Sequence, residues 1–479
     1  MLHPAPAASR PHRRLLGRAA LSGVLALALA GQAIAADYVM PAPPPADVPN
    51  GFTVLAAGDT ICHFPISGYV KQRTPRLIEI IKSADVAIAN FEDNAIDFKT
   101  YKGHPQAEAG GSWLVTTPGV PQDLADMGFD MVGRANNHST DWGVEGMEMT
   151  DNFLDKAGII HAGTGETLGA ARAARYLEAK TVGRVGLVSF ASSFETMSPA
   201  LNALGEVPGR PGMSALHTKK VSLVSAERLK QLGDIAKASG ERTPLDATPG
   251  DVTLAGATYR AADVGDKVST TYEMNPTDVR QITYAVRQGK LGGAFQAVYM
   301  HAHEGGETAR QPADFLPKIA HQAIDAGADA FFASGPHQVR GIEIYKGKPI
   351  FYSLGNFCHM DDPQFPQPQQ LYDQLGREPE AAPLGDMMHY WVETMFGRQE
   401  LLESVVATSK FENGVVSEIR LYPIWLGKGG RDQLRGMPLL ATPEQGKTVL
   451  ERIAKLSEPF GTKVTIENNV GVIRIAQPK

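Results

Sequence analysis

The chain has 479 residues, of which 46 are lysine or arginine and 52 are aspartate or glutamate, so its formal net charge is −6 at pH 7. This acidic balance, without a run of basic residues, argues against nucleic-acid binding and against a polybasic membrane patch. The length allows a large core, in one α/β domain or in two.

The N-terminus has the pattern of an export signal. Four arginines precede an apolar run at 19–30, and Ala33-Ile34-Ala35 has the small-x-small form of a cleavage site. The run is shorter than the roughly 20 residues that span a bilayer, and a retained anchor is the alternative. We therefore predict a signal peptide at 1–35, of a type compatible with the twin-arginine route, and a periplasmic or secreted protein. Cleavage would take the net charge from −6 to −10 and leave a Pro-rich leader at 36–50.

Apolar strands alternate with amphipathic helices after this leader. The strand-like "GFTVLAAGDT" and "DVAIANFE" flank the helical "PRLIEIIKSA". The helical "VPQDLADMGFD", the strand-like "MVGRANNH", the helical "EGMEMTDNFLDKAGI" and the strand-like "TVGRVGLVSF" continue the pattern. This alternation predicts an α/β domain whose strands carry polar residues at their C-terminal ends.

The pattern weakens between Glu195 and Gly289. Helices are predicted at "SAERLKQLGDIAKA" and "NPTDVRQITYAVRQGK", and the turn-rich sequence between them predicts an inserted arm at about 235–275. The strong pattern then returns, so we place the main domain at 51–360. A Gln- and Pro-rich loop, a hairpin turning at Asn413-Gly414 and a helix opened by a capping box at Thr442 predict an α+β extension, 361–479, that packs on the main domain.

Polar side chains follow several of the predicted strands at the point where each strand ends. Because the strand ends of such a sheet meet along one edge, residues far apart in sequence converge there. Carboxylates, carboxamides and imidazoles are the ligands of a divalent-cation site, and two ions about 4 Å apart would clamp a phosphoester. The residues in question are Asp59, Glu92, Asn137, His138, His301, His303 and His337. The alternative for Asn137-His138 is an Asn-capped helix start.

Several of these fragments resemble the successive motifs of one family. They are "AAGDTI", "ANFEDNAI", "ANNHSTDWGVEG", "YMHAHEGG", "SGPHQVRGIEIYKGKPIFYSLGNF" and "LSEPFGT". The sequence resembles the bacterial capsule-synthesis CapA family, also called the poly-γ-glutamate synthesis domain, closely over residues 50–360 and weakly beyond. The resemblance implies a fold related to the calcineurin-like metallophosphoesterases, a β-sandwich flanked by helices.

The resemblance also implies a role for each strand-end residue. Asp59 would be the first metal ligand, Glu92 the bridging carboxylate and Asn137 a ligand of a second ion, with His301 and His337 completing the coordination. The cofactor would be one or more divalent ions, such as Mn, Fe or Zn.

The two remaining site residues would act on the substrate. His138 would bind it or protonate a leaving group as general acid, and Asp141 would orient His138 or close the turn.

This chain departs from the family pattern in two places. Ser334 stands where the family has a histidine, and Asp59 is followed by Thr60-Ile61 without the Asp-x-His of true phosphoesterases. His63 or His303 is available to compensate, and the number of ions is left open.

Three functions are compatible with these residues. The first is an exported protein of capsule or poly-γ-glutamate biosynthesis, working with an anionic polymer and a membrane-bound synthesis complex. The second is a periplasmic metal-dependent hydrolase of phosphoesters or of polymer or peptide amide bonds. The third is a polymer-binding protein with a degenerate site, which Ser334 favours.

The chain has two cysteines, Cys62 and Cys358, and each directly follows one of these motifs. In an oxidising compartment they would form a disulfide, and two buried thiols are the equal alternative.

Overall fold

The computed structural model describes residues 42–106, 113–245, 247–360, 366–378, 380–381, 383, 385–390, 398–427 and 435–476. The predicted signal peptide at 1–35 and the first part of the predicted leader lie outside the described residues, as does 361–365 of the Gln- and Pro-rich loop. Within the described ranges, none of the helices is both long enough and apolar enough to cross a membrane.

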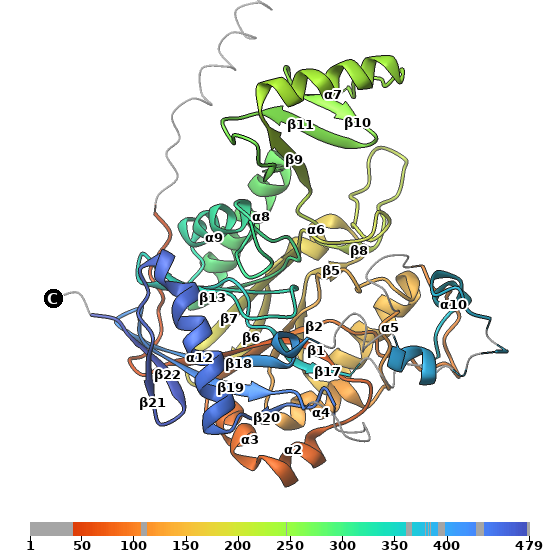
Figure 1. Cartoon of the computed structure of the whole chain (residues 1–479). Coiled ribbons are helices and arrows are strands. Elements are labelled where there is room, and N and C mark those ends of the chain that lie inside the picture. The colour runs from red at the N-terminus through yellow and green to blue at the C-terminus, as the bar shows by residue number, and fades with distance from the viewer. Residues whose placement is uncertain are drawn as a thin grey trace, which may run out of the picture. The chain divides into compact units, whose positions relative to one another are not determined.

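Two large sheets pack face to face in the unit that begins at Pro43 (Figure 1). The ten-stranded sheet runs in the order β21 (Thr465–Glu467), β22 (Val470–Arg474), β19 (Val415–Trp425), β18 (Glu403–Glu412), β1 (Thr53–Ile61), β2 (Val86–Phe91), β3 (Met131–Gly133) and β4 (Ile160–Ala162), with β17 (Asn356–His359) paired to β1 and β20 (Leu439–Leu440) to β19. The six-stranded sheet runs in the order β15 (Ile342–Tyr345), β16 (Lys348–Phe351), β14 (Ala330–Ser334), β13 (Phe295–His301), β7 (Gly183–Ala191) and β6 (Arg175–Ala179).

The main core lies between these sheets. Successive residues of a strand point to opposite faces, so Val54 of β1 enters the core shared with Tyr299 of β13, whereas Leu55 enters a second core under helices. The helices over that outer face are α2 (Ser67–Arg73), α3 (Pro75–Lys82), α4 (Val120–Met127) and α5 (Gly143–Ala157). The outer face of the six-stranded sheet is covered by α8 (Pro276–Gly292) and α9 (Phe315–Ala326). The predicted β-sandwich flanked by helices is therefore confirmed.

Both sheets are largely parallel around the middle of the sandwich. β1, β2, β3 and β4 are parallel neighbours, and so are β7, β13, β14 and β16. Their carboxyl ends carry Asp59, Glu92, His301 and Ser334. The topology therefore gathers strand-end side chains from two sheets in one place.

The C-terminal region completes the main sheet. The hairpin of β18 and β19 turns at Asn413-Gly414 as predicted, with both residues at positive φ, and β18 pairs antiparallel with β1. The capping box at Thr442 opens α12 (Pro443–Ser457), which packs on β19. This region also includes α10 (Gln369–Gln374) and the 3₁₀ turns η1 (Gln399–Leu402) and η2 (Glu458–Phe460). The hairpin predicted as an extension thus belongs to the ten-stranded sheet.

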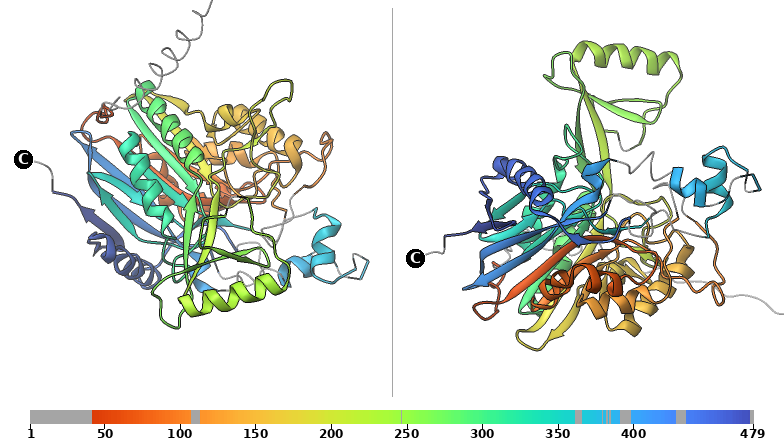
Figure 2. Two further views of the ribbon diagram at one scale, coloured as in Figure 1. Left: turned by 90° about the horizontal axis from the view of Figure 1, so that it is seen from above. Right: turned by 60° about the horizontal axis from the view of Figure 1, so that its bottom comes forward.

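The predicted arm contains a small sheet of its own. Its strands run in the order β10 (Val252–Leu254), β11 (Ala257–Ala261), β9 (Thr218–Val224) and β12 (Ser269–Met274), and Figure 2 shows α7 (Ala226–Ala238) beside them. The structure thus has three strands where the sequence predicts turns, and the sheet begins at Thr218. The short elements α6 (Leu168–Arg172), β5 (Thr164–Gly165) and β8 (Gly212–Met213) precede it.

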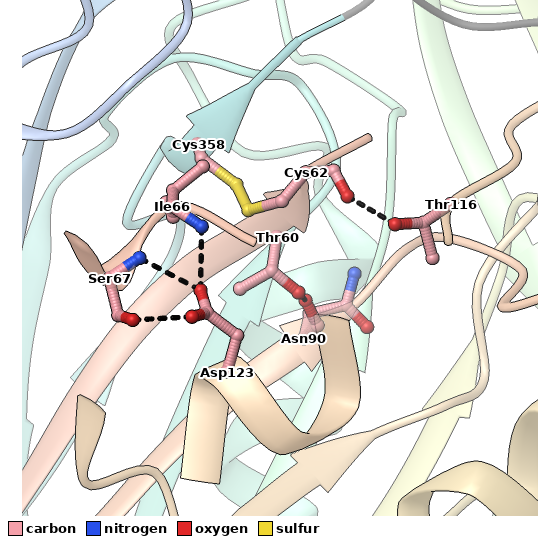
Figure 3. Close-up of a disulfide and its surroundings, with 8 residues drawn as sticks. All are labelled: Thr60, Cys62, Ile66, Ser67, Asn90, Thr116, Asp123 and Cys358. Atoms are coloured by element: carbon pink, nitrogen blue, oxygen red, sulfur yellow. Dashed lines mark hydrogen bonds between the residues drawn. A yellow bond between two sulfur atoms is a disulfide. The ribbon is translucent and has the colours of Figure 1, made fainter. Parts of the chain in front are cut away.

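A disulfide joins Cys62 to Cys358, with their Cα atoms 5.9 Å apart (Figure 3). Of the two alternatives open from the sequence, the structure has the bridge. It ties the end of β1 to the neighbouring strand β17, and both cysteines are buried. The Thr116 hydroxyl donates a hydrogen bond to the Cys62 carbonyl and fixes the loop beyond the bridge.

Candidate metal centre

Asp59 is held where β1 bends at the edge of the sandwich. Next to Asp59, the pairing of β1 shifts register both against β2 and against β17. Gly58 before it allows a very close backbone contact, because a Cβ at this position would lie 1.8 Å from the Gly355 carbonyl oxygen. The buried carboxylate accepts hydrogen bonds from Asn90 Nδ2 at 2.7 Å and from the Gly335 amide at 3.1 Å.

His301 connects the carboxylates of Asp59 and Glu92 across the sandwich. Its Nδ1 lies 3.6 Å from Asp59 Oδ1, and its Nε2 lies 3.3 Å from Glu92 Oε1. All three side chains are fully buried, and each offers a ligand atom within 4.8 Å of the others. Two carboxylates and one imidazole make a donor set suited to a divalent ion.

A second group of ligand atoms shares Glu92. His303 and His337 join Glu92 with ligand atoms again within 4.8 Å of one another. His303 Nε2 lies 3.0 Å from His301 Nε2 and 3.3 Å from the Asn137 side-chain oxygen. Glu92 thus lies between two donor sets, in keeping with the bridging position that the family resemblance implies.

Asn356 fixes the orientation of His337. The His337 ring places Nδ1 2.8 Å from Asn356 Oδ1, and its backbone has a φ of 55°. Because a carboxamide oxygen only accepts hydrogen bonds, Nδ1 carries the proton and Nε2 keeps its lone pair for a ligand bond.

The electrostatics favour the ionisation states that a cation needs. Burial raises the pKa of Asp59, but the hydrogen bond and charge of His301, together with His337, outweigh it and hold that pKa below its usual range. Burial, reinforced by His359, lowers the pKa of His337 to about 4. Desolvation of the ring, and then His301 and His337, lower the pKa of His303 well below its ordinary value. At neutral pH, Asp59 is therefore ionised and the imidazoles of His303 and His337 are neutral, as metal ligands are.

His138 and Asp141 form a buried pair beside this centre. His138 Nδ1 lies 2.7 Å from Asp141 Oδ2, which also accepts the Leu114 amide at 2.8 Å. Burial raises the pKa of Asp141, and His138 opposes that shift. Asp141 is therefore bonded to His138, the residue that it is predicted to orient. No side chain among the described residues caps α5, so the Asn-capped helix start is wrong.

Asn136 links the parts of the site, and it was not among the residues predicted from the sequence. Its Nδ2 donates to the Phe91 carbonyl at 2.9 Å and to Asn90 Oδ1 at 3.3 Å, while its Oδ1 accepts the His138 amide at 3.1 Å. Asn90 in turn donates to Asp59. One buried carboxamide therefore connects the strand that carries Glu92 with the turn that carries His138.

Arg134 holds the backbone on both sides of Glu92. Its Nη1 donates to the carbonyls of Phe91 at 3.1 Å and Asp93 at 2.8 Å, and its side chain is fully buried against Asp151. The sequence signal for these residues was their place beside strand ends, Asn90 and Asn356 within the family-like fragments and Arg134 directly before one of them, but of the carboxamides only Asn137 was selected there.

The residues proposed as compensating ligands have different positions. His303 lies in the centre, whereas His63 Nδ1 faces the Val115 carbonyl at 2.9 Å and belongs to neither ligand group. Ser334 Oγ lies 3.5 Å from His301 Nδ1, so a hydroxyl stands at the edge of the centre. His359 packs against His337 with 5.3 Å between ring centroids, and burial lowers its pKa to about 4.

The donor set fits a divalent metal ion. Each predicted ligand lies in the centre or beside it: Asp59, Glu92 and His301 in one group, His337 in the other, and Asn137 against His303. The nature of the ion and the number of ions are not fixed by these donors.

The helix-flanked sandwich and its carboxylate–imidazole centre define a protein of the metallophosphoesterase-like class. Within that class, residues 53–360 match the family described as bacterial capsule synthesis protein PGA_cap, which is more than half of the chain. The protein belongs to this family, and the resemblance seen in the sequence is confirmed.

Curated relatives fall into two groups. The uncharacterized proteins y4sH and y4uA of Sinorhizobium fredii are each 43% identical over 439 residues, 90% of this chain and 94% of theirs. The PGA biosynthesis protein CapA of Bacillus subtilis is 26% identical over 278 residues, 58% of this chain and 54% of its own length. The probable polyglutamine synthesis accessory protein Rv0574c of Mycobacterium tuberculosis is 27% identical over 222 residues, 46% of this chain and 43% of that protein. The match with this second group thus spans about half of each protein.

Proposed function

We propose that this protein is a metal-dependent hydrolase that acts in the biosynthesis of an anionic surface polymer of the poly-γ-glutamate type. The observation that carries the proposal is the pair of ligand groups sharing Glu92, beside the buried His138–Asp141 pair. The name of the Bacillus subtilis relative, PGA biosynthesis protein CapA, supports the polymer, whereas the Mycobacterium tuberculosis relative is named for polyglutamine synthesis.

The chain's own residues have separable tasks in this reaction. Asp59, Glu92, His301, His303 and His337 would hold the metal, which when bound polarises the scissile bond and activates water. Asp141 holds the His138 ring with Nδ1 toward the carboxylate, which leaves Nε2 as the atom that gives a proton to the leaving group. Asn137, next to His138 and within hydrogen-bond distance of His303, positions a polar group of the substrate.

The location and partners extend the same proposal. The signal-like residues 1–35 support export to the periplasm or beyond. There the protein would meet an anionic polymer or a smaller phosphoester or peptide, together with a membrane-bound synthesis complex.

The test begins with elemental analysis of protein purified without a chelating tag or column. Turnover of a generic phosphodiester and of γ-linked glutamate oligomers is then measured with and without Mn²⁺. His138→Ala should retain the metal and lose about 10²- to 10⁴-fold in rate. The matched control is His321→Ala, which removes another carboxylate-paired histidine, 2.9 Å from Glu343, on the outer helix α9. Metal-free protein, or a His138 variant as active as the His321 variant, would refute the hydrolase.

A polymer-binding protein without turnover is the second candidate. It is favoured by Ser334, whose hydroxyl near His301 is a poor ligand for a transition metal. Polymer binding that survives a chelator and is lost on substitution of Asn137 or His138, without hydrolysis of any substrate, would select it.

A further inference from the structure

The arm contains a cavity of about 860 Å³ between β9, β12 and the turn of the β10–β11 hairpin. Its lining includes His217, Lys219, Lys220, Ser222, Thr258 and Asn275. None of these residues belongs to the metal centre. The volume lies in the range of pockets that bind small organic ligands.

The cavity lies where the arm sheet is incomplete. β9 pairs with β12 over Thr218–Leu223, but it pairs with β11 only from Val221 onward. On the β11 side, the three residues before Val221 therefore have no strand neighbour among the described residues. This leaves about 10 Å of open strand edge, able to form backbone hydrogen bonds with an extended chain.

The side chains around this edge are predominantly cationic. Neither Lys219 nor Lys220 forms an ion pair with a described residue. One carboxylate lies in the lining: Glu273, the cross-strand neighbour of Lys219, is 2.7 Å from Arg260, which also pairs with Asp251. Neighbouring strand residues point to opposite faces, so a chain on the open edge would meet one lysine on each side of the sheet.

A histidine is fixed beside the lysines. His217 Nδ1 lies 2.7 Å from Asp278 Oδ2, and Arg172 binds the other oxygen of the same carboxylate. Because Nδ1 faces Asp278 and the His217 side chain is 54% exposed, the ring can present Nε2 outward. A ring held in this way can take part in a hydrogen bond with a bound ligand through Nε2.

We infer that the arm cavity is a second binding site, which takes an extended, amide-linked chain bearing carboxylates. The amide groups of such a chain would pair with the open edge of β9, and its carboxylates would meet Lys219, Lys220 and His217. The choice of a γ-linked glutamate chain as the ligand rests on the proposed function. The site itself does not depend on hydrolysis or on a bound metal.

The combination of edge and charge distinguishes this ligand from other anions. Polyphosphate would satisfy the lysines but has no amide N–H to offer the strand carbonyls. A neutral peptide would satisfy the edge but leave the lysines without partners. A polycarboxylate joined by amide bonds uses both features.

The experiment measures fluorescence anisotropy of a labelled γ-linked glutamate decamer with the full protein, in EDTA and at low salt. Lys219→Glu/Lys220→Glu should weaken binding by roughly tenfold or more, because two attractions become repulsions. The control is Lys230→Glu/Lys237→Glu, which makes the same charge change on exposed residues of α7 outside the cavity. It should bind like the wild type.

Lys219→Gln/Lys220→Gln and His217→Gln provide milder changes if charge reversal unfolds the arm. Equal binding by the cavity and α7 variants would overturn the site. Polyphosphate of equal charge competing as well as the glutamate chain would overturn the amide-linked ligand. Because the assay contains EDTA, binding at the arm is measured without metal-dependent hydrolysis. A failure of the hydrolase proposal would therefore not change the binding result, and a failure to bind would not contradict the hydrolase proposal.

Discussion

At the scale of single residues, the site depends on buried asparagine side chains as much as on the candidate metal ligands. Asn136, Asn90 and Asn356 each contact a predicted site residue or its backbone through a buried amide. Such groups are costly to leave unpaired, because an unsatisfied buried donor or acceptor costs about 1–3 kcal/mol. They therefore fix the side chains they touch.

Asn136→Ala should weaken metal binding without removing a ligand. The substitution removes one of the two hydrogen bonds to the Phe91 carbonyl, which keeps that from Arg134, and takes the acceptor from the His138 amide. Lost support of this kind reduces metal affinity by roughly 10- to 100-fold. Competition with a chelating dye measures the affinity. Asn202→Ala, an exposed asparagine that accepts the Gly169 amide, is the control. An Asn136 variant with unchanged affinity would show that the network is structural alone.

The sequence could bring the candidate ligands together because acids and imidazoles follow successive strands, whose ends meet at one edge of a sheet. Asp59, Glu92, His301 and His337 meet as predicted. Asn136 could not be told from Asn137, because adjacent asparagines at a strand end fit turn capping, ligation and support of a ligand equally well. The distinction is three-dimensional: Asn137 faces His303, whereas Asn136 faces the strand carbonyls.

At the scale of elements, the disulfide joins two strands that both serve the centre. Cys62 follows β1, which carries Asp59, and Cys358 lies in β17, which carries Asn356. Their separation of 296 residues means that the bridge closes a very long loop. Such cross-links stabilise chiefly by restricting the unfolded chain.

Cys62→Ala/Cys358→Ala should lower the free energy of unfolding by about 2–4 kcal/mol. Denaturant unfolding, compared between the variant and the wild type, measures the change. A reductant should destabilise the wild type and leave the variant unaffected. A variant as stable as the oxidised wild type would mean that the bridge adds nothing to the packing of β1 and β17.

Asp278 joins α8 to α6 and should make stability depend on pH. Burial opposes its ionisation, but hydrogen bonds from His217 and Arg172 hold its pKa below the ordinary value of 3.8. A lowered pKa in the fold contributes stability that is present above about pH 4 and is lost as the pH falls below it.

Asp278→Asn should therefore cost about 2–4 kcal/mol at pH 7, where it leaves the buried Arg172 without its charge partner. The difference from the wild type should shrink as the pH falls below about 4. Thermal unfolding from pH 7 to pH 3 tests both statements. Asp234→Asn, an exposed acid on α7, should show no such trend. A difference that stayed constant down to pH 3 would mean that ionisation of Asp278 is not the source of the stability.

Elements with strong periodicity were predictable, whereas the small sheet of the predicted arm was not. The helices α5, α7, α8 and α12 lie where apolar spacing and capping residues placed them. β10, β11 and β12 are only 3, 5 and 6 residues long, in a sequence rich in Gly, Thr and Asp. Short strands of mixed burial lack the alternation of apolar and polar residues from which a strand is predicted.

At the scale of the whole molecule, the candidate centre spans the sandwich. Asp59 and Glu92 come from the ten-stranded sheet and the segment that follows β2, whereas His301 and His303 come from the end of β13 in the six-stranded sheet. A bound ion would thus hold the two sheets together. Chain topology, which sequence patterns of single strands do not reveal, decides this arrangement.

Metal removal should therefore destabilise the entire sandwich. An ion present at about 100 times its dissociation constant stabilises the fold by about 2.7 kcal/mol, which is a rise of a few degrees in melting temperature. Calorimetry after exhaustive chelation, and again after Mn²⁺ or Zn²⁺ is restored, measures this shift. His301→Ala should abolish the response, and a response that persists in this variant would place the ion elsewhere.

The contact between Gly58 and Gly355 limits which sequences this architecture tolerates. Even one methyl group at residue 58 would collide with the backbone opposite, and Gly355 itself adopts a φ of 74°. A saturation-mutagenesis survey should accordingly reject alanine at residue 58 as firmly as it rejects changes at Asp59. Alanine would be rejected at residue 58 because its methyl group has no space, whereas changes at Asp59 would be rejected because they remove a candidate metal ligand. A survey that records only which substitutions are tolerated would therefore assign both positions to catalysis.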